Sequence, residues 1–126
     1  MITTDLIVSS LVQLLQQRVE LTPERLAYRF LGEGEEESRI SYGELDHRAR
    51  AIAAHLQETG TSGERALLLY PAGIAYVEAF FGCLYAGVIA VPAPLLRLNR
   101  NAQRLQAMIA DAEATMALTN ADFTII

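Results

Sequence analysis

The sequence contains no lysine, and all ten of its basic residues are arginines. A Walker-type phosphate loop ends in Gly-Lys-Ser/Thr, so this mode of phosphate binding is excluded. Schiff-base catalysis needs a lysine amine and is excluded for the same reason. The formal net charge is −5, and no segment concentrates the arginines. Because neutralised phosphates supply most of the affinity for nucleic acid, we expect no nucleic-acid partner.

Cysteine and histidine are also scarce. The single cysteine, Cys83, lies in an apolar stretch, which excludes an internal disulfide or a cysteine-rich zinc site and suggests a reducing, cytoplasmic location. His47 is predicted opposite the apolar face of its helix, and His55 on the flank of that face. We interpret both as solvated or boundary residues, since metal ligands would have to converge from one face. No metal site is predicted.

Features of an exported or membrane protein are weak. No basic region precedes an apolar core at the N-terminus, so no signal peptide is predicted. Residues 79–96 carry no charge and are long enough for a transmembrane candidate. Gly87, Pro92 and Pro94 interrupt this run, and no arginine pair flanks it. We therefore interpret it as a buried helix followed by a buried strand, and predict no membrane span.

The most informative stretch is a strand–helix–strand unit. Residues 65–70 form an apolar run of strand length, and residues 74–86 are apolar all around the helical wheel except at Glu78. Gly87 follows where a left-handed helix end is favoured, because it has no Cβ. Residues 88–91 are a second β-prone run. This order predicts a parallel βαβ unit with a right-handed crossover.

An amphipathic helix and a hairpin are predicted before this unit. The apolar stripe of residues 7–19 predicts a helix that ends before Pro23. Its candidate N-caps are Thr3, Thr4 and Asp5. Residues 26–31 and 39–40 flank a turn that is rich in glycine and glutamate, as in a β-hairpin. The glutamates would repel phosphate, so we interpret this segment as an exposed turn and not as a phosphate loop.

The hairpin leads into a second helix. Ser41 and Glu44 have the spacing of a capping box, in which each side chain bonds the backbone of the other. Apolar residues between Leu45 and Leu56 then fall on one face, and Gly60 ends the helix.

A third helix and strand are predicted after the βαβ unit. Asn99 or Asn101 can cap a helix whose apolar face includes residues 105–112, and residues 115–119 read as a third parallel strand. The predicted fold class is α/β: an open, mainly parallel sheet with packed helices, preceded by an N-terminal helix and a β-hairpin. Residues 122–126 are apolar and β-branched, so we expect the chain to be part of something longer.

Few side chains have the surroundings that catalysis requires. Ser41 is explained as a helix cap and Cys83 as core, and neither can be paired with a histidine from sequence. Glu78, a lone acid on an apolar helix, suggests a raised pKa. It lies one turn into its helix, however, where the dipole favours an acid and water is in reach. Without further information, the residues predict an α/β domain with no catalytic group.

Short motifs resemble those of a known superfamily. Residues 40–45, Ile-Ser-Tyr-Gly-Glu-Leu, resemble the early (Ser/Thr)-Tyr-x-Glu-Leu motif of adenylate-forming enzymes. Residues 84–92, Leu-Tyr-Ala-Gly-Val-Ile-Ala-Val-Pro, resemble their second motif. Within that superfamily, residues 63–71 and 80–87 are most similar to fatty acyl-AMP ligases, many of which load lipid or polyketide assembly lines. The sequence departs from that pattern at Ala72, where a second proline is common, and at Leu95-Leu96, which replaces a frequent Tyr-Pro-Pro.

The resemblance implies a parent enzyme that acts in two steps. A fatty acid and ATP-Mg²⁺ would give an acyl-adenylate and pyrophosphate, and the acyl group would pass to a carrier-protein thiol or to coenzyme A. The phosphate loop, adenine motif, ribose-binding aspartate and catalytic lysine of the family would all lie beyond Ile126. No catalytic, cofactor-binding or metal residue is therefore assigned to this chain, and it is expected to bind no cofactor by itself.

The expected domain organisation follows from this resemblance. Residues 1–126 would be an N-terminal fragment of an adenylation domain, incomplete at its C-terminus, that packs on the remainder of the domain and is inactive alone. A fragment of an acyl-CoA synthetase or of a nonribosomal peptide adenylation domain is the alternative within the superfamily. From another class, a free-standing flavodoxin-like binding module or a docking element remains open.

Overall fold

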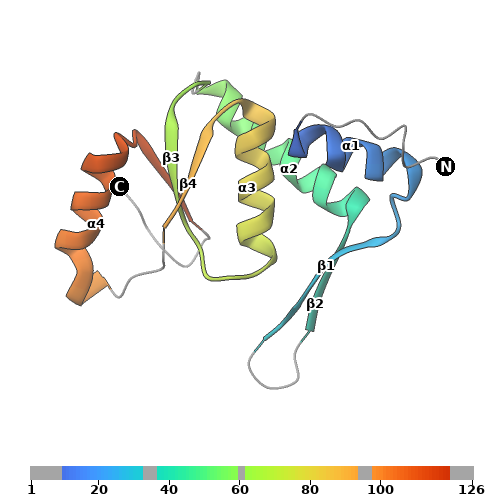
Figure 1. Ribbon diagram of the computed structural model, residues 1–126, viewed down its shortest axis with the longest axis horizontal. Helices are drawn as coiled ribbons and strands as arrows, with labels where there is room; N and C mark the ends of the chain where they lie inside the picture. The colour runs from blue at the N-terminus through green and yellow to red at the C-terminus, as the bar shows by residue number, and fades with distance from the viewer. Residues whose placement is uncertain (1–9, 33–36, 60–61, 94–97, 120–126) are drawn as a thin grey trace.

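A parallel three-stranded sheet and a separate hairpin organise the chain in the computed structural model, which describes residues 10–32, 37–59, 62–93 and 98–119 (Figure 1). The elements follow in the order α1 (Leu11–Leu21), β1 (Leu26–Leu31), β2 (Glu37–Ser41), α2 (Tyr42–Glu58), β3 (Arg65–Leu69), α3 (Ile74–Ala86), β4 (Ile89–Pro92), α4 (Leu98–Ala112) and β5 (Met116–Thr119). The predicted α/β class, with its N-terminal helix and hairpin, is confirmed.

Strand β3 lies at the centre of the sheet, in the order β4-β3-β5, and both of its neighbours run parallel to it. Ala66 pairs with Ala90 on one side and with Met116 on the other. Pro92 was expected to stop the strand, but it is the last residue of β4 and pairs with Leu68. β4 is an edge strand of the described sheet, where a proline is tolerated because no further strand needs its missing N–H.

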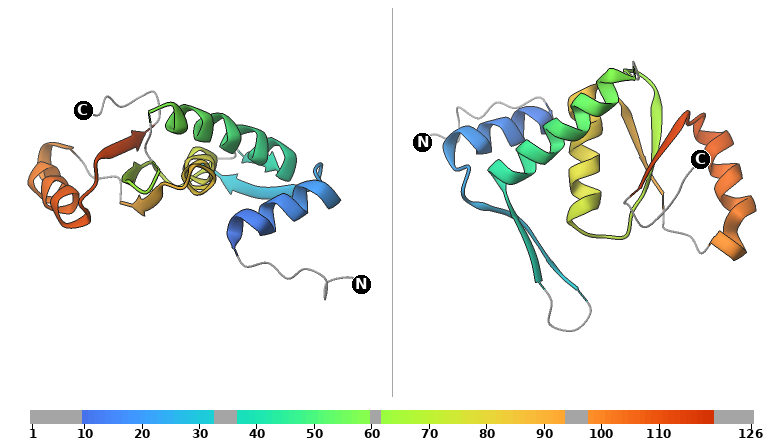
Figure 2. Two further views of the ribbon diagram at one scale, coloured as in Figure 1. Left: turned by 90° about the horizontal axis from the view of Figure 1, so that it is seen from above. Right: turned by 180° about the vertical axis from the view of Figure 1, so that it is seen from behind.

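Helices cover both faces of this sheet (Figure 2). Ala66 and Leu68 of β3 pack into a core with buried residues of α2 and α3, whereas Leu67 and Leu69 pack into a second core with Met108 of α4. Successive side chains of a strand point to opposite faces. The unbroken apolar run in β3 is therefore explained by burial on both sides, as in other parallel sheets.

Helices α2 and α3 approach each other closely because of a glycine. A Cβ built at Gly82 would lie 2.7 Å from the Cβ of Ile52 and 3.4 Å from the carbonyl oxygen of Ala49. Only hydrogen at this position allows the two helices to pack at their observed separation. At the end of α3, Gly87 adopts the left-handed conformation with φ of 75°, as predicted.

The N-terminal half agrees with the sequence in its elements and differs in one cap. In the predicted capping box, Glu44 N–H donates to Ser41 Oγ at 3.2 Å, and Ser41 N–H donates to Glu44 Oε1 at 2.9 Å. Helix α1 ends before Pro23 as expected but begins at Leu11, where Ser10 Oγ accepts from Gln13 N–H. The cap candidates Thr3, Thr4 and Asp5 precede the described residues, as do the first residues of the predicted stripe.

Helix α4 begins earlier than predicted. It starts at Leu98, so Asn99 and Asn101 lie inside the helix and do not cap it. The predicted turn residues 33–36 and the predicted helix end at Gly60 lie outside the described residues. None of the helices in the described part of the chain combines the length and apolar character needed to cross a bilayer.

Candidate functional site

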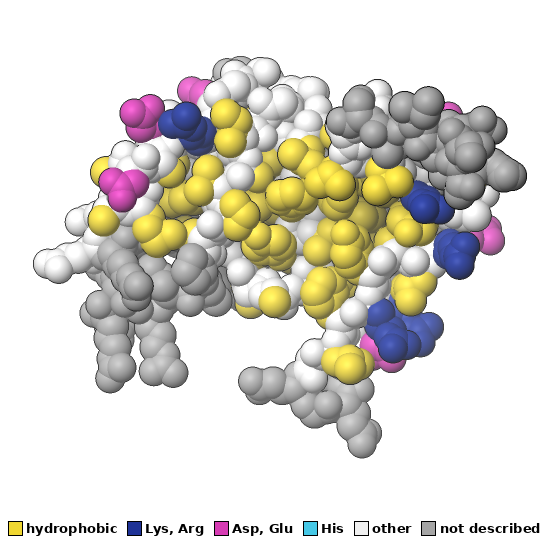
Figure 3. Space-filling view, viewed as in Figure 1, with side chains coloured by type: hydrophobic (Ala, Val, Ile, Leu, Met, Phe, Trp, Pro, Cys, Tyr) yellow, Lys and Arg dark blue, Asp and Glu magenta, His cyan; other side chains and the backbone are white. Residues whose placement is uncertain are grey.

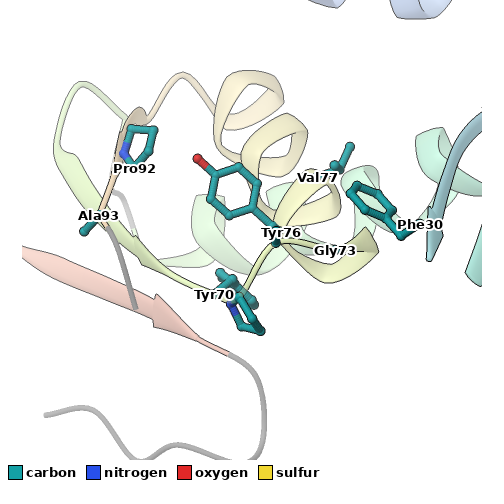
Figure 4. Close-up of a pocket in the computed structure, with 9 residues that line it drawn as sticks. Phe30, Tyr70, Gly73, Tyr76, Val77, Pro92 and Ala93 are labelled. Atoms are coloured by element: carbon teal, nitrogen blue, oxygen red, sulfur yellow. The ribbon is translucent and has the colours of Figure 1, made fainter. Parts of the chain in front are cut away.

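A cleft of about 640 Å³ opens at the carboxyl ends of strands β3 and β4 (Figure 4). In open α/β sheets, ligands usually bind outside the carboxyl ends of the strands, so this cleft is the candidate site by position. The residues that line it come from three segments of the chain and are Phe30, Tyr70, Pro71, Ala72, Gly73, Tyr76, Val77, Pro92 and Ala93.

The backbone explains why these residues meet. β3 ends at Leu69, and the loop of residues 70–73 turns the chain directly into α3. The first turn of α3 then presents Tyr76 and Val77 beside the end of β4, where Pro92 lies. Phe30 reaches the cleft from the β1–β2 hairpin. The hairpin and the sheet edge therefore form the two walls of one apolar depression.

The chemistry of the cleft is almost wholly apolar. Among its lining residues, the only polar side chains are the phenols of Tyr70 and Tyr76. Burial raises the pKa of Tyr70, so its phenol stays neutral at physiological pH. A cleft of this kind can bind apolar surface and donate a hydrogen bond, but it offers no acid, base or nucleophile.

ATP and Mg²⁺ do not fit the residues present. No arginine or carboxylate lines the described cleft, and its loop lacks the glycine pattern that cradles phosphates. Within the described ranges, no group of three or more His, Cys, Asp or Glu residues is arranged to hold a metal ion. We therefore assign no step of nucleotide chemistry to this part of the chain.

A second polar feature, which sequence reasoning missed, joins α2 to α3. Asp46 is buried, with 8% of its surface exposed. The Tyr85 hydroxyl donates to Asp46 Oδ1 at 2.7 Å, and Arg50 Nε donates to Asp46 Oδ2 at 2.9 Å. The Arg50 guanidinium also lies 5.9 Å from the centroid of the Tyr85 ring. Burial, and then the bond to Asp46, raises the pKa of Tyr85.

The sequence had placed the acids of α2 on exposed faces, and this was wrong for Asp46. Its position beside buried Leu45, and its i,i+4 spacing to Arg50, were the available signals. Both carboxylate oxygens are bonded within the protein. The cluster therefore serves as a polar joint between two helices and leaves no free group for catalysis.

The individually considered residues lie where a structural role predicts. His47 and His55 are exposed on α2. Cys83 is fully buried, and burial raises the pKa of its thiol to about 11, which makes it a poor nucleophile. Glu78 is less accessible than expected: its side chain is 14% exposed and lies 3.4 Å from Arg48 Nε. Burial raises the pKa of Glu78, and Arg48 partly offsets this.

Comparison with known proteins identifies the family. The family model described as AMP-binding enzyme matches residues 15–125. The medium-chain-fatty-acid–[acyl-carrier-protein] ligase JamA of Moorena producens is 51% identical over 116 residues, which cover 89% of this chain and 20% of that protein. The putative fatty-acid–CoA ligase FadD21 of Mycobacterium tuberculosis is 33% identical over 115 residues, which cover 88% of this chain and 20% of that protein.

Solved structures agree with this assignment. The fatty acyl-adenylate ligase from L. pneumophila, determined with acyl adenylate and pyrophosphate, matches 93% of this chain with a TM-score of 0.87 and 36% identity. The match covers 21% of that structure, and the chain spans about a fifth of the length of the curated relatives named above. With a family model matched over nearly its whole length, the chain belongs to the family of AMP-binding enzymes.

Proposed function

We propose that residues 1–126 form an N-terminal scaffold section in the large lobe of a fatty acyl-AMP ligase. The parent enzyme would activate a fatty acid with ATP and Mg²⁺ as an acyl-adenylate, releasing pyrophosphate, and pass the acyl group to an acyl carrier protein thiol. The observation that carries this proposal is the 51% identity, over 116 residues, to a ligase whose name specifies both a medium-chain fatty acid and a carrier protein.

The scaffold role is supported by what the residues can do. The βαβ unit of β3, α3 and β4 is occupied in packing, and Cys83 is buried in it. The cleft at its edge has no charged lining residue in the described chain. Binding of phosphates and Mg²⁺ needs cations and carboxylates that this surface does not supply. We therefore propose that the chain alone catalyses nothing.

The acceptor is the less supported part of the proposal. Relatives at 33% identity carry the name fatty-acid–CoA ligase, so transfer to coenzyme A is the alternative. The higher identity to the carrier-protein ligase favours a carrier-protein thiol.

The test is a chimera in which this chain replaces the matching segment of the Moorena ligase. We expect the purified chimera to show ATP–pyrophosphate exchange that depends on a medium-chain fatty acid, with the same mixture lacking the acid as control. Mass spectrometry of holo carrier protein and of coenzyme A then identifies the acceptor. A folded chimera that gives no acid-dependent exchange would refute the proposed function, and acylation of coenzyme A alone would refute the proposed acceptor.

A further inference from the structure

We propose that the apolar cleft lined by Tyr70–Gly73, Tyr76 and Pro92 is a docking surface for the part of the parent ligase that lies outside this chain. The proposal rests on the proposed function, because it takes the parent to be a longer ligase. It adds where the two parts of the lobe meet and which chemistry holds them together.

The surface around the cleft is unusually apolar for the outside of a folded chain. Figure 3 shows hydrophobic side chains gathered over the centre of this face, with the charged side chains toward its rim. Ala72 and Pro92 are exposed, while Tyr70 and Tyr76 are half-buried. Contiguous apolar patches rimmed by polar groups generally mark surfaces that bind a partner.

The lining restricts the chemistry of the occupant. No described residue of the cleft carries a charge, so an anion such as a phosphate would be desolvated there without a partner. Aliphatic or aromatic side chains can fill the cleft, and backbone carbonyls can accept from the Tyr70 and Tyr76 hydroxyls. A polypeptide segment with apolar side chains supplies both.

The size of the relatives indicates which polypeptide this is. The chain corresponds to 20% of the Moorena ligase, so about 80% of such a protein remains to cover the face. A TM-score of 0.87 over 93% of this chain indicates that the backbone around the cleft keeps its shape in a structure about five times longer. A second copy of the chain is a weaker candidate, because β4 ends at Pro92, which limits strand addition at that edge.

The experiment measures hydrogen exchange of residues 70–77 in the isolated chain and in the chimera with the Moorena ligase. The loop that forms the cleft floor is open to solvent in the isolated chain. We expect its amides to exchange at least tenfold more slowly in the chimera. Ala72→Glu places a charge in the cleft and should remove this protection. Ala51→Glu makes the same change at an exposed position of α2 outside the cleft and should leave it intact.

Three controls separate the possible outcomes. Both variants of the isolated chain should unfold at the temperature of the native chain, so that a loss in the chimera reports docking. Equal exchange of residues 70–77 in the isolated chain and the chimera overturns the proposal, even if the chimera forms acyl-adenylate. Protection in a chimera without ligase activity supports docking while refuting the proposed function. Protection that grows with the concentration of the isolated chain identifies a second copy as the occupant and overturns the proposal.

Discussion

Replacement of Tyr85 by phenylalanine tests the polar joint between α2 and α3. The change removes one hydroxyl, which donates at 2.7 Å to the buried carboxylate of Asp46. A hydrogen bond to a charged group contributes about 1.5–3 kcal/mol, and its loss leaves one carboxylate oxygen unsatisfied. The other oxygen keeps its bond to Arg50, whose side chain is 63% exposed, so that ion pair is screened by solvent. We expect Tyr85→Phe to lower the free energy of unfolding by about 2 kcal/mol.

Urea unfolding followed by far-ultraviolet circular dichroism measures this free energy. The matched control is Tyr76→Phe, the same change on the same helix, since the Tyr76 hydroxyl points into the open cleft (Figure 4). At this chain length, about 2 kcal/mol corresponds to a fall in the melting temperature of roughly 8 °C. The reasoning is refuted if Tyr85→Phe is as stable as Tyr76→Phe.

Three further predictions concern α3. Gly82→Ala should lower the free energy of unfolding by about 1–3 kcal/mol because its Cβ would clash with Ile52. Adding Ile52→Ala should recover part of this loss in a double-mutant cycle, and purely additive losses would contradict the clash. Burial raises the pKa of Cys83 from 9.0 to about 11, so its contribution is complete below pH 9 and about 2–3 kcal/mol is lost as the pH rises to 11. The native chain should therefore lose stability more steeply than Cys83→Ala over this range, and equal slopes would argue against a buried thiol. Burial also raises the pKa of Glu78, so its ionised form is unfavourable above that pKa. Glu78→Gln should stabilise the chain by about 0.5 kcal/mol at pH 7 and lose this advantage near pH 4; equal gains in melting temperature at both pH values would contradict this.

The central unit could be predicted because its signals are local. The four apolar residues from Ala66 to Leu69 are buried on both faces of the sheet, and burial of this kind produces a continuous apolar run. The bounds of α3 were predicted correctly, since Gly87 provides the left-handed end that the chain needs. The Ser41 cap also depends only on residues within one helical turn.

The features that sequence reasoning missed depend on distant parts of the chain. Asp46 is buried because Tyr85, on another helix, accepts it as a hydrogen-bond partner in the folded chain. The cleft joins Phe30 of the hairpin to Pro92 at the end of β4, and no local pattern predicts that approach. Asn99 and Asn101 have good capping chemistry, yet α4 begins before both of them.

The account holds that this chain provides a scaffold and that the chemistry lies elsewhere in the parent enzyme. The most direct measurement is ATP–pyrophosphate exchange by the purified 126-residue chain, with and without a medium-chain fatty acid, beside the chimera as positive control. The account predicts acid-dependent exchange by the chimera and none above the blank by the chain alone. Acid-dependent exchange by the chain alone would contradict it.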